Sequence, residues 1–286
     1  MTTDFLIDTD QLHNALDSDH IRIFDCTTIL KPHPEKVYTV EAAIDTYEAG
    51  HIPGAGFLDL QNALSDRSSA LRFTLPSPEQ FSEVAAAAGI SNDNHVILYS
   101  TTAPMWATRL WWMFRIFGHE RVSVLDGGFA KWQKEGKPVS GDLPAFPRGE
   151  YVAEKDTTRV ADKQDVLNAI TAESCCVLNA LSRDQFVGEG QHYGRPGRIS
   201  HSENLPWSDL IDVQTGCFLP INDLRTRLEA TSALASDRVI TYCGGGIAAS
   251  VDLFAMALLG MEHKVALYDN SLSEWVQDPS APMETG

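Results

Sequence analysis

The chain contains two segments in which a short apolar, β-branched run is followed by a long apolar stretch and then by a second short apolar run. They are residues 96–132, VILYSTTAPMWATRLWWMFRIFGHERVSVLDGGFAKW, and residues 239–275, VITYCGGGIAASVDLFAMALLGMEHKVALYDNSLSEW. A short continuous apolar run predicts a buried strand, and a longer apolar stretch predicts a helix. Each segment is therefore expected to form a strand, a helix and a strand, a unit that requires a parallel sheet.

The two segments are similar over most of their length. Each long apolar stretch stops at a glycine, Gly118 or Gly260, which is the residue type typical just past a helix end. The flanking strands are expected at 96–99 and 122–125, and at 239–242 and 264–268. Matched residues share an offset of 143 positions (243 − 100) and include Ser100 with Cys243, Asp126 with Asp269, and Trp132 with Trp275.

Weaker similarity extends towards the amino terminus of each segment, where 21–26 and 175–180 both predict strands. The loops at 49–60 and 196–207 are also alike. The chain is therefore expected to be an α/β protein with two similar domains, each a central parallel sheet flanked by helices.

The expected linker is a segment rich in Pro and Gly that lacks periodicity. It divides the chain into a first domain at residues 1–136, a linker at 137–152 and a second domain at 153–286. The aromatic block WWMF, residues 111–114, has helical spacing and is expected to pack in the core of the first domain and at the domain interface.

The amino-acid composition limits the classes of protein to which the chain can belong. The chain has 286 residues, 43% of them hydrophobic, which suits a globular protein with a sizeable core. Its formal net charge of −17 disfavours nucleic acid as a partner, because an acidic surface repels phosphates. The amino-terminal stretch MTTDFLIDTDQLHNAL lacks the pattern of a signal peptide, and we expect no membrane span and a cytoplasmic location.

The five cysteines are irregularly spaced and form no CxxC pair, so neither a disulfide framework nor a metal site is expected. Cys243 differs from the others because it follows a predicted strand and precedes three glycines and a predicted helix beginning near Ile247. Sites of parallel sheets form at this end of a strand. The N–H groups at the start of a helix have no partner within the helix, and glycine leaves them accessible because it has no side chain. Such N–H groups can stabilise a thiolate or a persulfide.

The turn allows three other interpretations. Cysteine is often simply buried, and that is the favoured interpretation for the other four cysteines, Cys26, Cys175, Cys176 and Cys217. A nucleotide phosphate loop would end in Lys-Ser or Lys-Thr, which is absent here. A cysteine phosphatase needs an arginine six positions after the cysteine, and Ala249 stands there.

Four stretches together resemble the tandem-domain rhodanese family of thiosulfate and 3-mercaptopyruvate sulfurtransferases. They are HIPGA (51–55), RLWWMFRIFGHERVSVLDGGFAKW (109–132), GRISHSENLPW (197–207) and YCGGGIAAS (242–250). The resemblance implies two rhodanese-like domains, of which only the second is catalytic, in agreement with Ser100 in the first copy and Cys243 in the second. It also implies a Cys243 persulfide, formed from a small sulfur donor and discharged to a thiol or cyanide, with no metal and no organic cofactor.

The resemblance implies further site residues. The persulfide would be held by the backbone of Gly244, Gly245, Gly246, Ile247 and Ala248, and His51 matches a histidine that could act in a proton relay. The loop is closer to the mercaptopyruvate branch than to the thiosulfate branch, which has cationic residues directly after the cysteine.

The stretch NALSRDQF, residues 179–186, departs from the family pattern, because Gln185 stands where a substrate-binding arginine is expected. Arg183, Arg195 and Arg198 are the nearby cations that could bind the donor instead. The sequence thus leaves two functions open: a sulfurtransferase that uses Cys243, and a rhodanese-like sulfur carrier or binding module without efficient turnover of small molecules.

Overall fold

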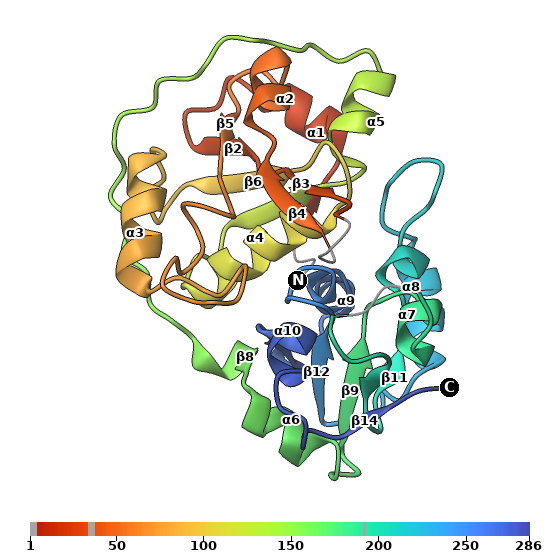
Figure 1. The fold of residues 1–286 in the computed structure, drawn as a ribbon. Coiled ribbons are helices and arrows are strands. Elements are labelled where there is room, and N and C mark those ends of the chain that lie inside the picture. The colour runs from red at the N-terminus through yellow and green to blue at the C-terminus, as the bar shows by residue number, and fades with distance from the viewer. Residues whose placement is uncertain (1–4, 34–37, 191–192) are drawn as a thin grey trace.

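A computed structural model describes residues 5–33, 38–190 and 193–286, and the first four residues of the amino-terminal stretch lie outside these ranges. Two α/β domains lie against each other (Figure 1), and a segment without helices or regular strands runs along the outside of the first domain to reach the second. The division of the chain at residues 137–152 stays a prediction. No helix in the described ranges is both long enough and apolar enough to cross a bilayer.

The first domain is built on a parallel sheet in the order β1-β7-β6-β2-β5. An antiparallel hairpin of β3 and β4 extends from this sheet. The strands are β1 (Leu6–Ile7), β2 (Ile21–Asp25), β3 (Thr28–Lys31), β4 (Thr39–Ala42), β5 (Gly56–Phe57), β6 (His95–Tyr99) and β7 (Val122–Leu125). The helices are α1 (Thr9–Asn14), α2 (Ile44–Ala49), α3 (Pro78–Ala87), α4 (Met105–Ile116) and α5 (Gly128–Lys134).

The second domain repeats this strand order as β8-β13-β12-β9-β11, again parallel. Its strands are β8 (Val160–Ala161), β9 (Cys175–Asn179), β11 (Glu203–Asn204), β12 (Arg238–Tyr242) and β13 (Val265–Tyr268), with an antiparallel pair of β10 (Arg198–Ile199) and β14 (Met283–Glu284). The helices are α6 (Lys163–Ala169), α7 (Arg183–Val187), α8 (Ile221–Glu229), α9 (Ala249–Leu258) and α10 (Ser271–Trp275), with 3₁₀ turns η1 (Thr157–Arg159), η2 (Trp207–Leu210) and η3 (Glu262–Lys264).

The predicted helices and strands are largely confirmed. Gly118 and Gly260 follow α4 and α9 with positive φ angles of 83° and 77°, as glycines past a helix end do. Several boundaries differ from the prediction by one or two residues, including the ends of β2 and β9 and the starts of β6 and β12. The strand expected from residue 264 begins at Val265, because a 3₁₀ turn precedes it, and the helix expected near Ile247 begins at Ala249.

The domains are joined through their long central helices, α4 and α9, which face each other in Figure 1. The rings of Trp111 and Phe254 meet edge to face at 4.8 Å, and the hydroxyls of Thr108 and Ser250 share a hydrogen bond of 2.7 Å. The WWMF block is buried, as predicted, and Trp111 is part of the interface. Because one continuous core crosses this contact, the domains pack as one body.

Candidate active site

Cys243 lies directly after β12 and is only 2% exposed. The Ser271 hydroxyl accepts hydrogen bonds from the N–H groups of Cys243 (3.1 Å) and Gly246 (3.2 Å), and donates one to the Tyr268 carbonyl (2.8 Å). This single side chain at the start of α10 therefore fixes both ends of the turn that the three glycines form.

The backbone of the turn presents unpaired N–H groups. Among the described residues, the N–H groups of Gly244, Gly245, Ile247 and Ala248 make no hydrogen bond, and no side chain caps α9. Gly246 has a φ angle of 74°, and a Cβ atom there would overlap the carbonyl oxygen of Asp269. Such an array at a helix start is suited to an anion beside Cys243.

Arg109, which belongs to α4 of the first domain, makes hydrogen bonds to the turn and to the residues that support it. Its guanidinium donates to the Gly246 carbonyl (3.2 Å), to Asp269 Oδ1 (2.6 Å) and to the Phe73 carbonyl (2.6 Å). The side chain is completely buried. Sequence reasoning missed this residue, and the available signal was an arginine within an otherwise apolar helical stretch.

Pairs of equivalent contacts relate the two domains. Asp269 Oδ2 accepts the Leu75 N–H, and Asp126 Oδ1 accepts the Phe218 N–H, both at 2.9 Å. Both the aspartates and the amides are 143 positions apart (269 − 126 and 218 − 75). Each domain therefore extends an equivalent loop, residues 70–75 or 213–218, over the other domain at the carboxyl end of its sheet.

Two tyrosines cover Cys243. Tyr193 lies so close to Gly244 that a Cβ atom there would overlap its ring, and the Tyr38 ring lies 6.5 Å from the Tyr193 ring, edge to face. Burial raises the pKa of both phenols, and a charge on Cys243 contributes to both rises. One ring from each domain therefore lies near the buried Cys243, with Tyr193 against the next residue, Gly244.

The predicted substrate-binding arginines are engaged elsewhere. Arg195 donates to the carbonyls of Asp278 (2.9 Å) and Ala281 (3.0 Å). Arg198 pairs with Glu284 at 3.3 Å, and the guanidinium groups of Arg198 and Arg183 both lie over the Phe186 ring, at 4.5 and 5.6 Å. Gln185 lies in the first turn of α7, where its N–H donates to the Ser182 hydroxyl at 3.4 Å.

His51 is placed within the first domain. Its Nδ1 lies 2.8 Å from the Tyr47 carbonyl oxygen, its Nε2 lies 3.1 Å from the Asp142 carbonyl oxygen, and its ring stacks on that of Tyr47. The described contacts of His51 are therefore those of a buried residue that joins α2 to the segment after α5.

The remaining cysteines lie apart from this turn. All five thiols are free, and burial is the main cause that raises the pKa of Cys26, Cys175, Cys176 and Cys217, to about 12 for Cys176. Such thiols are poor nucleophiles near neutral pH. No group of three or more His, Cys, Asp or Glu side chains suited to a metal ion occurs in the described part of the chain.

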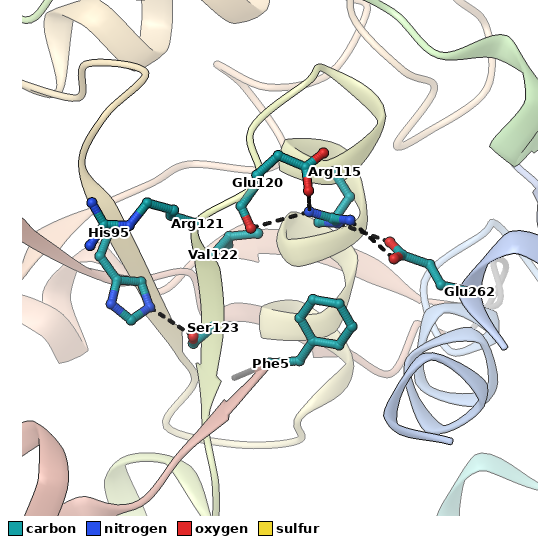
Figure 2. A pocket seen from close by; sticks show the side chains of 8 residues that line it. All are labelled: Phe5, His95, Arg115, Glu120, Arg121, Val122, Ser123 and Glu262. Atoms are coloured by element: carbon teal, nitrogen blue, oxygen red, sulfur yellow. Dashed lines mark hydrogen bonds and ion pairs between the residues drawn. The ribbon is translucent and has the colours of Figure 1, made fainter. Parts of the chain in front are cut away.

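A pocket of about 360 Å³ lies at the opposite, amino-terminal end of β6 and β7 (Figure 2). Arg115 lies there between Glu120 and Glu262, with bonds of 2.5 Å to Glu120 and 2.9 Å to Glu262, and His95 lies beside Ser123. Arg115, the buried cation of this pocket, is already paired with two carboxylates, one of them from the second domain. The pocket therefore contains an interdomain ion-pair cluster and offers no reactive group comparable to Cys243.

Comparison with known proteins agrees with this geometry. The rhodanese-like domain model matches residues 8–135 and 182–278. The chain is 32% identical to 3-mercaptopyruvate sulfurtransferase of Escherichia coli over 99% of both chains, and 33% identical to thiosulfate sulfurtransferase of Cricetulus griseus over 84% of this chain and 81% of the relative.

Solved structures give the same result. The crystal structure of SseA from Escherichia coli, described as having the rhodanese fold of 3-mercaptopyruvate sulfotransferases, matches with a TM-score of 0.82 and 32% identity. The match covers 94% of this chain and 99% of SseA. The Tum1 protein of Saccharomyces cerevisiae has the same fold, with a TM-score of 0.84 at 22% identity over 99% of each chain.

Proposed function

Because this chain belongs to the rhodanese-like domain family and is a sulfurtransferase, we propose that it transfers a sulfane sulfur through a persulfide on Cys243. The observation that carries the proposal is the set of unpaired N–H groups around this one cysteine, at the start of α9. An anionic sulfur placed there is stabilised by backbone dipoles without any basic side chain.

The transfer has two steps. The Cys243 thiolate attacks the sulfur of the donor, an S–S bond forms, and the donor's bond to that sulfur breaks with its electron pair leaving on the donor. The acceptor thiolate, or cyanide, then attacks the outer sulfur of the persulfide, and Cys243 leaves as the thiolate. The four N–H groups stabilise the charge on the cysteine sulfur before the first step and after the second.

We propose 3-mercaptopyruvate as the preferred donor. The residues after Cys243 are Gly244 and Gly245, so the turn itself carries no cation for a dianion such as thiosulfate. With 3-mercaptopyruvate the carbon–sulfur bond breaks, and the resulting enolate takes a proton to become pyruvate. The full-length relative from Escherichia coli, whose name states this donor, supports the choice.

The roles expected for Arg183, Gln185, Arg195, Arg198 and His51 stay predictions. The side chains of Gln185, Arg195, Arg198 and His51 have contacts away from the turn that would have to be exchanged for contacts with the donor. The Arg183 side chain lies over Phe186. The cytoplasmic location and the absence of a nucleic-acid partner also stay predictions, which rest on the composition of the chain.

The proposal is tested by mass spectrometry after incubation with each donor. We expect one added sulfur on the peptide that contains Cys243, no addition in Cys243→Ser, and unchanged addition in the matched variant Cys217→Ser. Full transfer activity in Cys243→Ser would refute the assignment. Addition of a single sulfur without turnover to thiol acceptors would instead identify a sulfur carrier.

A further inference from the structure

An anionic donor approaching this acidic protein needs a local positive charge, and the turn around Cys243 does not contain one. The three arginines expected from the second domain point their guanidinium groups at Phe186, at backbone carbonyls and at Glu284. Arg109 is near the turn, but it is fully buried and paired with Asp269. Arg195 and Arg198 are therefore occupied, whereas Arg183 is exposed and has no ion pair among the described residues. The first domain is the other source of a cation for the donor.

The internal repeat identifies a candidate. In the first domain, a pocket of about 220 Å³ lies at Ser100, the counterpart of Cys243, and the second-domain loop residues Thr215 and Gly216 line it. The counterpart of Thr215, at the offset of 143, is Arg72. By the same relation, Arg72 of the first domain is placed over the turn that begins at Cys243.

The backbone of the Arg72 loop is fixed against this turn. The next residue, Phe73, has a φ angle of 62°, close to the 71° of its counterpart Gly216, although a side chain disfavours that conformation. The Phe73 carbonyl accepts from Arg109, and the Leu75 N–H donates to Asp269. Two buried hydrogen bonds therefore hold Arg72 at the interface of the domains.

The side chains form a continuous series from Arg72 to the turn. The Arg72 guanidinium carbon lies 5.6 Å from the Tyr38 ring centroid, and its Nη1 donates to the Tyr38 carbonyl at 2.9 Å. Tyr38 contacts Tyr193, which lies on Gly244. Arg72 itself is exposed, and within the described ranges no carboxylate pairs with it. Its charge is thus available to a ligand.

We propose that Arg72 binds the carboxylate of the sulfur donor, and that the phenol groups of Tyr38 and Tyr193 line the path from it to Cys243. This proposal rests on the proposed function and adds the residue that recognises the donor. It explains how a chain with Gln185 in place of an arginine retains a cation for its donor, supplied by the domain that lacks the catalytic cysteine. A single guanidinium also suits a monoanionic carboxylate better than a dianion.

The test compares charged and neutral donors in the full-length protein. In Arg72→Gln, we expect kcat/KM for 3-mercaptopyruvate to fall about 10- to 100-fold, mainly through KM, because a charge-assisted hydrogen bond is lost. Persulfidation of Cys243 by mercaptoacetone should change less than about twofold, because this neutral analogue lacks the carboxylate but also breaks its carbon–sulfur bond, and its enolate takes a proton to become acetone. Arg72→Lys should recover part of the loss, since it restores the charge without the planar fork.

Arg67→Gln is the matched control, because Arg67 is an exposed cation in the same loop region and donates to the Asn62 carbonyl. It should behave as the unmodified protein does. Equal losses for charged and neutral donors in Arg72→Gln, or no loss for either, would overturn the proposal while leaving Cys243 as the sulfur carrier. Failure of the unmodified protein to form a Cys243 persulfide with any donor would instead refute the proposed function.

Discussion

Asp25 and Asn179 occupy equivalent positions at the ends of β2 and β9, each opposite the tyrosine that precedes the Ser100 or Cys243 turn. Asp25 Oδ1 accepts the N–H (2.9 Å) and the hydroxyl (2.5 Å) of Thr27, and Asn179 Oδ1 accepts the Leu181 N–H (2.8 Å). Asp25 is 1% exposed, and its Oδ2 has no hydrogen-bond partner in the described part of the molecule. Asp25 therefore accepts the same kind of backbone hydrogen bond as Asn179, but it adds a carboxylate in a buried position.

We predict that Asp25→Asn stabilises the protein at neutral pH. Burial raises the pKa of Asp25 from 3.8 to about 6, against the opposing effect of the Thr27 hydrogen bonds. Below pH ~3 the carboxyl is protonated in both folded and unfolded chains, so it has no effect there. Between pH ~4 and ~6 the unfolded chain releases a proton that the folded chain keeps, which costs stability. The full cost is about 3 kcal/mol above pH ~6, at about 1.36 kcal/mol per pKa unit.

Urea unfolding followed by tryptophan fluorescence at pH 4 and pH 7.5 measures this effect. The free energy of unfolding of Asp25→Asn, relative to the unmodified protein, should rise by about 2.4 kcal/mol between the two pH values, because about 0.6 kcal/mol of the cost is already present at pH 4. The reverse change in the second domain, Asn179→Asp, is the matched control and should lower stability at pH 7.5 more than at pH 4. A difference for Asp25→Asn that is the same at both pH values would refute the reasoning, because only titration makes it depend on pH.

Three further substitutions follow from the structure. Asp252→Leu should raise the free energy of unfolding by about 1–3 kcal/mol at pH 7.5 and by less at pH 4, as measured by urea unfolding at both pH values. The reason is that burial raises the pKa of this completely buried carboxyl, and its two oxygens have no partners among the described residues. Arg109→Met should cost about 3–5 kcal/mol in the same assay, because it leaves Asp269 without its buried partner, and a loss below about 1 kcal/mol would contradict this account of the interface. Ser271→Ala should lower stability by about 1–3 kcal/mol and slow persulfidation of Cys243, because two N–H groups of the turn lose their acceptor; an unchanged rate in stopped-flow measurements would show that Ser271 does not order the turn.

The sequence by itself determined the parts that depend on near neighbours along the chain. Apolar runs at 96–99 and 239–242 predict β6 and β12, and the glycines at 118 and 260 predict where α4 and α9 end. The equivalence of Ser100 and Cys243 follows from the repeat, and the glycines between a predicted strand and a predicted helix single out Cys243 as the candidate reactive cysteine. Strand and helix preferences are local, so a pattern of ten to twenty residues contains them.

Only the tertiary structure decided what surrounds Cys243. Arg109 belongs to the first domain, and no local pattern indicates that it contacts a turn more than 130 positions later in the chain. The contact of Tyr38 with Tyr193, which lies on Gly244, is likewise invisible in the sequence. The arginines near Gln185 in the sequence were expected to bind the donor, yet their side chains contact Phe186, Glu284 and backbone carbonyls. The packing of α4 against α9 and the two aspartate contacts set which loop lies beside the Cys243 turn and which lies beside the Ser100 turn. These are contacts between residues far apart in sequence.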